Sequence, residues 1–374
     1  MNRLRQRNNT PAKPVGITFE ITHMDPMGQG VDKTGERVTF IAKTLPGERG
    51  TAQVMKSRKG VRFAQVDALT HPAAMRVEAD CPHFYECPGC HYLHTDYATE
   101  LAFKREALIR ALAKLEFDST KIEVIAAERR NAYRTRMQLH YRQRRIGLID
   151  PLRNAIVEIP QCEVIREELK ASLQSLYNDK SWQLNVGENG HCELLLDAAQ
   201  AEIAWNLPYA HGGFSQVNDR MNEHLCALVN RHLEHANPRS LLDLFCGDGN
   251  LSNHITQSLG CKRTMIDLTD TRHRDFVPLD LLKDNALSKF RRDHQRHSFD
   301  ALLLDPPRAG FKHLNSWSAA FKPKDIVYVS CASATLARDL KTIAEHYSIQ
   351  SVTLIDMFPG TFHFETVVHL RSMN

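Results

Sequence analysis

The sequence contains no long apolar run, its first residues lack an apolar segment, and its cysteines are odd in number. No stretch approaches the ~18 consecutive apolar residues that a membrane-spanning helix requires, and the basic N-terminal segment MNRLRQRNNTPAKP lacks the apolar core of a secretory signal. Nine cysteines, an odd number, argue against a disulfide framework. We therefore expect a cytoplasmic protein without a membrane partner, whose residues 1–13 form a flexible tail.

The chain has enough apolar residues to build more than one core. It comprises 374 residues, of which 42% are hydrophobic and 25% charged, as is typical of two or three folded domains. The net charge is only +4, but residues 1–70 hold twelve Lys and Arg against six Asp and Glu, and further arginines crowd into residues 129–145. Such clusters favour a polyanionic partner, although solvated loops and strand edges would give the same pattern.

Short strands separated by Gly and Pro turns fill residues 14–72 and predict a small β-barrel. Four basic residues on or beside one hairpin of this barrel could face phosphate groups, namely Lys56, Arg58, Lys59 and Arg62. The alternative is that these residues only make the surface of the barrel soluble.

The pattern changes twice along the rest of the chain. Residues 73–205 contain a crowded group of cysteines, an amphipathic helix expected over 97–115 that can pack against the next domain, and antiparallel strands with one helix between them. From residue 206 to 374, apolar strands alternate with helices, which predicts a doubly wound, mainly parallel sheet. Ligands of such sheets bind at the carboxyl ends of the strands, and the motifs described next all lie there.

The first motif, LLDLFCGDGNLS, leads from a buried strand through Gly247 and Gly249 into a helix. Glycine lets the backbone turn sharply and approach a ligand closely. The next strand ends in Asp267, whose carboxylate could bridge a ribose diol, so the two features together indicate a nucleoside site. The sequence has no G-x-G-x-x-G motif, which disfavours a dinucleotide.

Three further motifs carry groups suited to chemistry. Asp305 is followed by two prolines that force a rigid exit from its strand. Cys331 ends another strand directly before a helix, whose N-terminus should lower the pKa of the thiol, although a lone cysteine is more often a buried apolar residue. If His363 and Glu365 share a strand, both point to one face, and Glu365 could act as a base or pair with an arginine.

These segments, taken together and in order, resemble the RNA uracil-C5 methyltransferases, which use S-adenosylmethionine to make 5-methyluridine in ribosomal or transfer RNA. The matching segments are FSQVN at 214–218, LDLFCGDGN at 242–250, DPPRAG at 305–310, SCASATLARD at 330–339 and DMFPGTFHFE at 356–365. The segment MDPMGQGVDKTGERVTFIAKTLPGER resembles the TRAM domain, an OB-like RNA-binding barrel of this family. The resemblance implies a multidomain fold: an N-terminal barrel, a central antiparallel β domain and a C-terminal Rossmann-like class I methyltransferase domain.

The resemblance also assigns roles to residues of the C-terminal domain. Uracil C5 is a poor nucleophile, so a thiolate first adds to C6 and gives C5 carbanion character, and a base later removes the C5 proton. The resemblance implies Cys331 as the nucleophile and Glu365 as the base. It places six residues at the cofactor, namely Gln216, Phe245, Asn250, Asp267, Asp280 and Asp305. Phe214, Gln216 and Asp305 are expected to touch the target base, which must be flipped out of the RNA.

Four cysteines are the candidate ligands of a metal site. Cys81, Cys87 and Cys90 have the spacing C-x5-C-x2-C, and Cys162 follows far downstream. Four thiolates could hold zinc tetrahedrally, and the spacing alone does not choose the metal. The resemblance implies a [4Fe–4S] cluster. Because the reaction needs no redox step, we interpret this cluster as structural.

The sequence departs from the family most between Asp267 and Asp280, where only twelve residues stand in place of a full helix, and Asp270 could replace Asp267 at the ribose. The leading prediction is a monomeric methyltransferase of 23S ribosomal RNA, and the alternative substrate is the T-loop uridine of transfer RNA. A cytosine-C5 methyltransferase is disfavoured because its nucleophile follows a proline, whereas Ser330 precedes Cys331. A catalytically inactive RNA-binding or assembly protein is an alternative of a different class.

Overall fold

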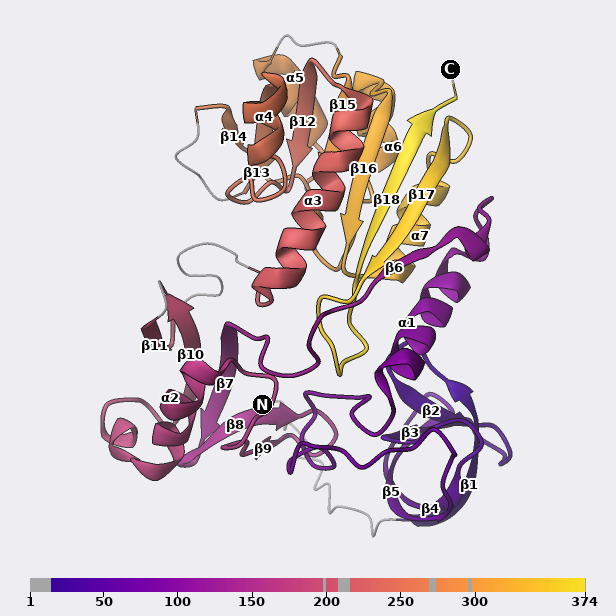
Figure 1. The fold of residues 1–374 in the computed structure, drawn as a ribbon, viewed down its shortest axis with the longest axis vertical. Helices are drawn as coiled ribbons and strands as arrows, with labels where there is room; N and C mark the ends of the chain where they lie inside the picture. The colour runs from indigo at the N-terminus through magenta and orange to yellow at the C-terminus, as the bar shows by residue number, and fades with distance from the viewer. Residues whose placement is uncertain (1–14, 198–199, 208–215, 269–273, 295–297, 374) are drawn as a thin grey trace, which may run out of the picture.

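The described residues form three β-sheets (Figure 1). The computed structural model describes residues 15–197, 200–207, 216–268, 274–294 and 298–373, so the predicted tail at 1–13 lies outside the described residues. None of the helices in these ranges is long and apolar enough to cross a membrane.

The first sheet is a closed five-stranded barrel in the order β1-β2-β3-β5-β4, which confirms the predicted small barrel. Its strands are β1 (Val15–Met24), β2 (Gln29–Asp32), β3 (Thr39–Ala42), β4 (Arg49–Arg58) and β5 (Val61–His71). Alternate residues point inward, and Phe19, Ile21 and Ile41 fill the interior. Antiparallel pairing of β4 with β5 leaves the side chains of Lys56 and Lys59 exposed on their hairpin.

The second sheet is five-stranded, in the order β11-β10-β7-β8-β9, and each of its strand pairs is antiparallel. Its strands are β7 (Arg136–Arg142), β8 (Arg145–Asp150), β9 (Ala155–Val157), β10 (Asn189–Asp197) and β11 (Gln200–Trp205). Helix α2 (Glu167–Asn178) buries Leu169 and Leu173 in a core that also holds Leu139 and Leu194 of the sheet. A short 3₁₀ helix, η2 (Ser181–Leu184), follows α2.

The third sheet has eight strands in the order β14-β13-β12-β15-β16-β18-β17-β6. They are β6 (Glu123–Ile125), β12 (Ser240–Leu244), β13 (Lys262–Asp267), β14 (Phe276–Pro278), β15 (Ala301–Leu304), β16 (Asp325–Ser330), β17 (Tyr347–Ile355) and β18 (Glu365–Ser372). β18 runs antiparallel between β16 and β17, and the other pairs are parallel. The predicted doubly wound, mainly parallel sheet is therefore present, and β6 joins it from the segment expected to form the central domain.

Helices cover both faces of the third sheet because the residues of its strands alternate between two cores. Leu242 and Leu244 of β12 pack with α5 (Ala286–Asp293), α6 (Leu314–Phe321) and α7 (Ser333–Lys341). Leu241 of β12 and Leu303 of β15 instead pack with α3 (Asp219–Ala236) and α4 (Asn253–Leu259).

Helix α1 (Tyr97–Leu112) also contributes to the first of these two cores, through Leu108 and Leu112. It lies against α7. The sequence predicted that this helix continues to residue 115, and this is wrong by three residues, because the chain leaves the helix at Ala113 and turns toward the 3₁₀ helix η1 (Ser119–Lys121).

The connection between β17 and β18, residues 356–364, leaves the sheet and reaches down to the chain that precedes α1 and to the central domain, as the yellow loop in Figure 1 shows. We call these residues the β17–β18 loop. It ends at Glu365, the first residue of β18.

Candidate active site and cysteine cluster

The carboxyl ends of β12 and β13 form one ligand-binding edge of the third sheet. β12 ends at Leu244, and the backbone then turns through Gly247 and Gly249, both with positive φ (+50° and +80°). A Cβ at Gly249 would lie 2.6 Å from the side-chain oxygen of Asn253, so this turn requires glycine. The backbone N–H of Gly247 donates to the carboxylate of Asp267 at 2.9 Å. The strand-ending aspartate and the glycine turn are therefore direct neighbours.

Other residues assigned to the cofactor lie at the same edge. Leu279 N donates to Asp267 O at 2.8 Å, which brings the adjacent Asp280 beside Asp267. Asp305 N donates to Leu244 O at 3.3 Å, which places Asp305 next to Phe245. The side chain of Asn250 exchanges hydrogen bonds with that of Asn222 on α3, at 2.9 and 3.1 Å.

These contacts do not include three of the residues named from the sequence. Gln216 is half-buried just before Asn218, the residue that caps α3. Phe214 and Asp270 lie outside the described residues.

Several carboxyl groups lie close together at the ligand-binding edge, where two of them have raised pKa values. Burial raises the pKa of Asp305 to about 7, and the charges of Asp243 and Asp267 add to the rise. Burial also raises the pKa of Asp243 to about 7, although a hydrogen bond from Ser252 acts in the opposite direction. Sequence reasoning missed Asp243 although it lies within the first motif, because it stands in the middle of an apolar strand and not at the strand end. This edge has an excess of negative charge that would favour a cationic ligand.

Cys331 and Glu365 meet at the neighbouring strand ends. Ser330 is paired with Thr366 in the antiparallel ladder of β16 and β18, and Cys331 and Glu365 are the next residues beyond this pair. Cys331 is half-buried, whereas Glu365 is 5% exposed. The carboxyl oxygen Oε2 of Glu365 is buried and has no hydrogen-bond partner among the described residues.

The predicted lowering of the pKa of Cys331 is wrong. Burial is the main cause that raises the pKa of this thiol to about 11, the charges of Glu365 and Asp305 add to the rise, and the charge of Arg308 and a backbone hydrogen bond oppose it. Helix α7 begins at Ser333, and the two carboxyl groups that raise the pKa come from β18 and from the end of β15. These groups are distant in sequence, so the local motif could not show them.

The same groups act on Glu365. Burial raises its pKa well above the usual value for glutamate, the charge of Asp305 adds to the rise, and Arg308 lowers it. Arg308 thus favours the ionised form of both Cys331 and Glu365, a role that the sequence analysis did not assign to it. His363 was expected to share a strand with Glu365, and this is wrong because β18 begins at Glu365.

The four cysteines Cys81, Cys87, Cys90 and Cys162 line one small pocket between the segment before α1 and the central domain. Burial is the main cause of the raised pKa of Cys90, and the charges of Cys87 and Cys162 add to it, so these sulfur atoms lie near one another. No group of three or more His, Cys, Asp or Glu side chains within the described ranges is arranged to hold a single metal ion.

Comparisons with known proteins agree with this arrangement. The family model "tRNA (Uracil-5-)-methyltransferase" matches residues 282–373. The 23S rRNA (uracil(1939)-C(5))-methyltransferase RlmD of Pectobacterium atrosepticum is 30% identical, over 98% of this chain and 95% of the relative. The chain belongs to the RNA uracil-C5 methyltransferases.

Two further likenesses cover nearly the whole of this RNA uracil-C5 methyltransferase. RlmD of Vibrio vulnificus is 26% identical over 93% of this chain and 94% of the relative. Among solved structures, the tRNA (uracil-54, C5)-methyltransferase of Pyrococcus abyssi in complex with S-adenosyl-L-homocysteine superimposes with a TM-score of 0.67. It covers 95% of this chain and 100% of that chain at 21% identity, and this likeness shows the shared fold.

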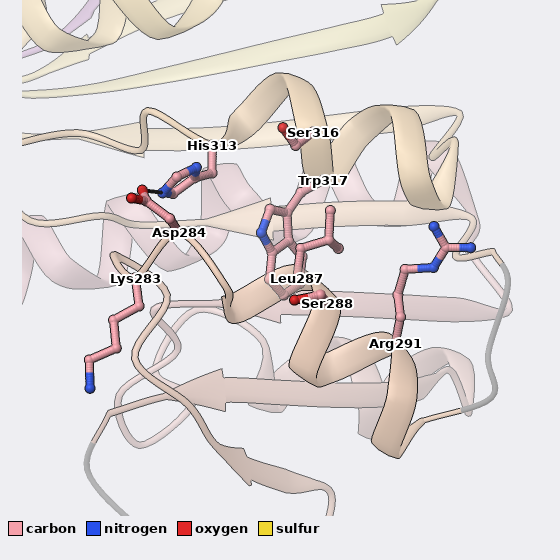
Figure 2. A pocket seen from close by; sticks show the side chains of 8 residues that line it. All are labelled: Lys283, Asp284, Leu287, Ser288, Arg291, His313, Ser316 and Trp317. Carbon is pink, nitrogen blue, oxygen red and sulfur yellow. Dashed lines mark ion pairs between the residues drawn. The ribbon is translucent and has the colours of Figure 1, made fainter.

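A cavity of about 450 Å³ also lies between α5 and α6 (Figure 2). Its lining combines Lys283 and Arg291 with the apolar Leu287 and Trp317, and Asp284 lies 3.4 Å from His313 at its rim. None of the candidate site residues lines this cavity.

Proposed function

We propose that this enzyme transfers a methyl group from S-adenosylmethionine to C5 of one uridine in 23S ribosomal RNA, through a covalent adduct between Cys331 and uracil C6. The observation that carries the proposal is the juxtaposition of Cys331 with Glu365 beside the ligand-binding edge of the same sheet. Relatives that bear the name of a 23S rRNA uracil-1939 methyltransferase match nearly the full length of the chain, which supports ribosomal RNA as the substrate.

The described residues suit S-adenosylmethionine. The glycine turn brings the backbone close to a ligand. Beside it, Asp267 accepts from Gly247 N through Oδ2 at 2.9 Å and from Leu268 N through Oδ1 at 2.5 Å. Each carboxylate oxygen keeps a further lone pair with which it could accept from a ribose hydroxyl. The carboxyl groups of Asp243, Asp267 and Asp305 would favour the positive sulfonium of the cofactor. We propose that Gln216, Phe245, Asn250 and Asp280 complete the site. When bound, the cofactor supplies the electrophilic methyl group.

The protein's own residues then carry the covalent chemistry. As the sulfur of Cys331 bonds to C6, its proton leaves to solvent or a neighbouring carboxylate, and the C5–C6 electron pair becomes available at C5 for the methyl group. The ionised carboxylate of Glu365 next removes the C5 proton, and the released electron pair re-forms the C5–C6 double bond as Cys331 departs as a thiolate. Asp305 and Gln216 are proposed to contact the base, together with Phe214. Arg308 supports the ionised form of Cys331 and of Glu365.

We further propose that the four cysteines hold a [4Fe–4S] cluster with a structural role. The four cysteines line one pocket. Four thiolates could hold zinc or the iron atoms of a cubane, and the resemblance of the chain to the family favours the cluster.

The barrel and the central domain are proposed to bind the RNA around the target uridine. Exposed basic residues on the β4–β5 hairpin support this role for the barrel. We also propose the division of the chain into 14–72, 73–205 and 206–374, and a monomeric, cytoplasmic enzyme.

The decisive experiment is methylation of RNA by the purified enzyme with radiolabelled S-adenosylmethionine. We expect label in 23S transcripts, at C5 of a single uridine, and none with Cys331→Ala, which should still bind the RNA. The family model and the solved relative carry transfer-RNA names, so a transfer-RNA transcript is the second substrate to test. Label only in the T-loop of that transcript would replace ribosomal RNA by transfer RNA. Absence of label in both RNAs, with no cofactor binding in calorimetry, would support the inactive RNA-binding protein.

A further inference from the structure

We propose that the β17–β18 loop (residues 356–364) holds Glu365 in place through contacts with the cysteine segment, helix α1 and the central domain, and that Tyr133 and Lys104 are positioning residues for removal of the C5 proton. This inference rests on the proposed role of Glu365 as the base. It adds to that role a statement of which elements outside the third sheet hold the base in position.

The cysteine segment binds the loop through backbone hydrogen bonds. His91 N and Tyr92 N, the two amides directly after Cys90, both donate to Gly360 O, at 2.6 and 3.0 Å. Gly360 has a positive φ of +78°, and a Cβ there would lie 2.9 Å from Leu93. The loop and the cysteine segment are therefore in direct contact, and a larger residue at position 360 would push them apart.

Helix α1 holds the loop through a buried ion network. The ammonium group of Lys104 donates to Asp356 at 2.7 Å, to Glu100 at 2.6 Å and to Phe358 O at 3.3 Å. The side chains of Lys104, Glu100 and Asp356 have no exposed surface. Glu100 in turn accepts from Gly360 N at 2.7 Å. Removing Lys104 would leave two buried carboxylates competing for the remaining hydrogen-bond donors, which would strongly destabilise the folded protein.

The central domain and α3 hold two further residues of the loop, Pro359 and Met357. The hydroxyl group of Tyr133 donates to Pro359 O at 3.0 Å, and Asn218 at the start of α3 donates to Met357 O at 3.1 Å. Tyr133 is buried in the core of the central domain.

Residues 356–360 of the loop are thus tied to several different elements, most of which lie outside the third sheet. Glu365 follows the loop directly and makes no hydrogen bond through Oε2 within the described chain. A catalytic carboxylate must be held within about 0.5 Å of its productive position. We conclude that the loop contacts fix the base, and that the folded state of the cysteine segment controls how well it is fixed.

The test compares two tyrosines that make the same kind of bond at different places. Tyr133→Phe removes the hydrogen bond to Pro359 O, and Tyr347→Phe removes an equivalent buried bond to Pro323 O (2.9 Å), near the start of β16 and away from the loop. Both variants should lose similar stability. With saturating RNA and cofactor, we expect Tyr133→Phe to accumulate several-fold more methylated covalent adduct on a denaturing gel and to release tritium from C5 about tenfold more slowly. The KM for the cofactor should not change, and Tyr347→Phe should behave as the wild type does.

A second measurement does not depend on activity. Hydrogen exchange of the amides in 356–364 should accelerate in Cys90→Ser and in Lys104→Met, relative to strand β1 of the same molecule. Equal adduct levels in both tyrosine variants, or unchanged exchange of the loop in both Cys90→Ser and Lys104→Met, would overturn the inference. A wild-type enzyme that forms neither 5-methyluridine nor adduct would instead refute the proposed function, so the two failures are distinguishable.

Discussion

The carboxyl group of Glu365 raises the pKa of the thiol of Cys331, and the two residues adjoin the Ser330–Thr366 pair of the β16–β18 ladder. With burial as the larger cause and Asp305 as a further contributor, the pKa of the thiol reaches about 11. A pKa in this range favours the neutral thiol at neutral pH, and the thiolate is a small fraction that grows as the pH rises.

This leads to a prediction for alkylation of Cys331 by iodoacetamide in the free enzyme. Only the thiolate reacts, so below a pKa of about 11 the rate should rise roughly tenfold for each pH unit between 7 and 10. Peptide-resolved mass spectrometry separates Cys331 from the other eight cysteines. A rate that levels off below pH 9 would show that the charge of Arg308 prevails over burial and the two carboxyl groups.

Asp305→Asn should stabilise the folded protein at neutral pH while it impairs catalysis. Asp305 has a folded-state pKa of about 7, above its value of about 4 in the unfolded chain, so the folded state binds this proton more tightly. The stability of the wild type therefore falls as the pH rises from 4 to 7, and the variant escapes this loss. Because Asp305 is partly exposed, we expect a gain on the order of 1–3 kcal/mol at pH 8 and none at pH 4.

Urea unfolding at pH 4, 6 and 8 measures this difference. Asp248→Asn is the control, since Asp248 is an exposed carboxylate in the neighbouring glycine turn. A gain that does not depend on pH would show that it arises from a cause other than the buried charge.

Glu365→Gln should trap the enzyme on its RNA. Addition of Cys331 and methylation of C5 do not require the carboxylate of Glu365, whereas removal of the C5 proton does. We expect turnover to fall by at least about 100-fold and a methylated covalent complex to survive on a denaturing gel. The double variant Cys331→Ala with Glu365→Gln should give no complex, which shows that the bond involves this sulfur. Full activity without any adduct would reject Glu365 as the base.

The sequence was sufficient to predict the main strands and helices, but it was not sufficient to predict the contacts between them. Alternating apolar residues and glycine turns predicted the barrel, and apolar strands such as Ala301–Leu304 predicted the doubly wound sheet. The contacts of Lys104 could not be predicted, because Asp356 comes from the far end of the chain. For the same reason the pKa of Cys331 was predicted in the wrong direction. The adjacent helix is visible in the sequence, whereas the burial of the thiol and its proximity to the carboxyl groups of Glu365 and Asp305 are produced by the fold.

The β4–β5 hairpin provides a test of RNA binding by the barrel. Lys56→Glu with Lys59→Glu reverses two exposed charges on this hairpin. If each lysine contacts one phosphate, the slope of log affinity against log salt should become shallower by about 2. Charge reversal at Lys262, exposed at the start of β13 away from the strand ends that carry the site, is the control. An unchanged slope would mean that the barrel does not contact the RNA backbone at this hairpin.

Lys43 of the barrel should be required for retention of the proposed iron–sulfur cluster. Its ammonium group donates to Cys87 O at 2.9 Å, to Cys90 O at 2.8 Å and to Phe84 O, and it lies 3.9 Å from the centre of the Phe84 ring. It thus ties the loop that bears two of the four cysteines to the barrel. Hydrogen bonds to a charged group contribute about 1.5–3 kcal/mol each, so Lys43→Met should release this loop.

The variant should purify with less iron and acid-labile sulfide than the wild type and should lose the remainder faster to a chelator. Lys33→Met, an exposed lysine on the same barrel, should leave both contents unchanged. Because zinc would leave no labile sulfide, the same measurement on the wild type distinguishes a cluster from a zinc site. Equal iron and sulfide in the wild type and Lys43→Met would show that the cysteine loop keeps its shape without the barrel, and the contribution of Lys43 would then be limited to docking the two parts together.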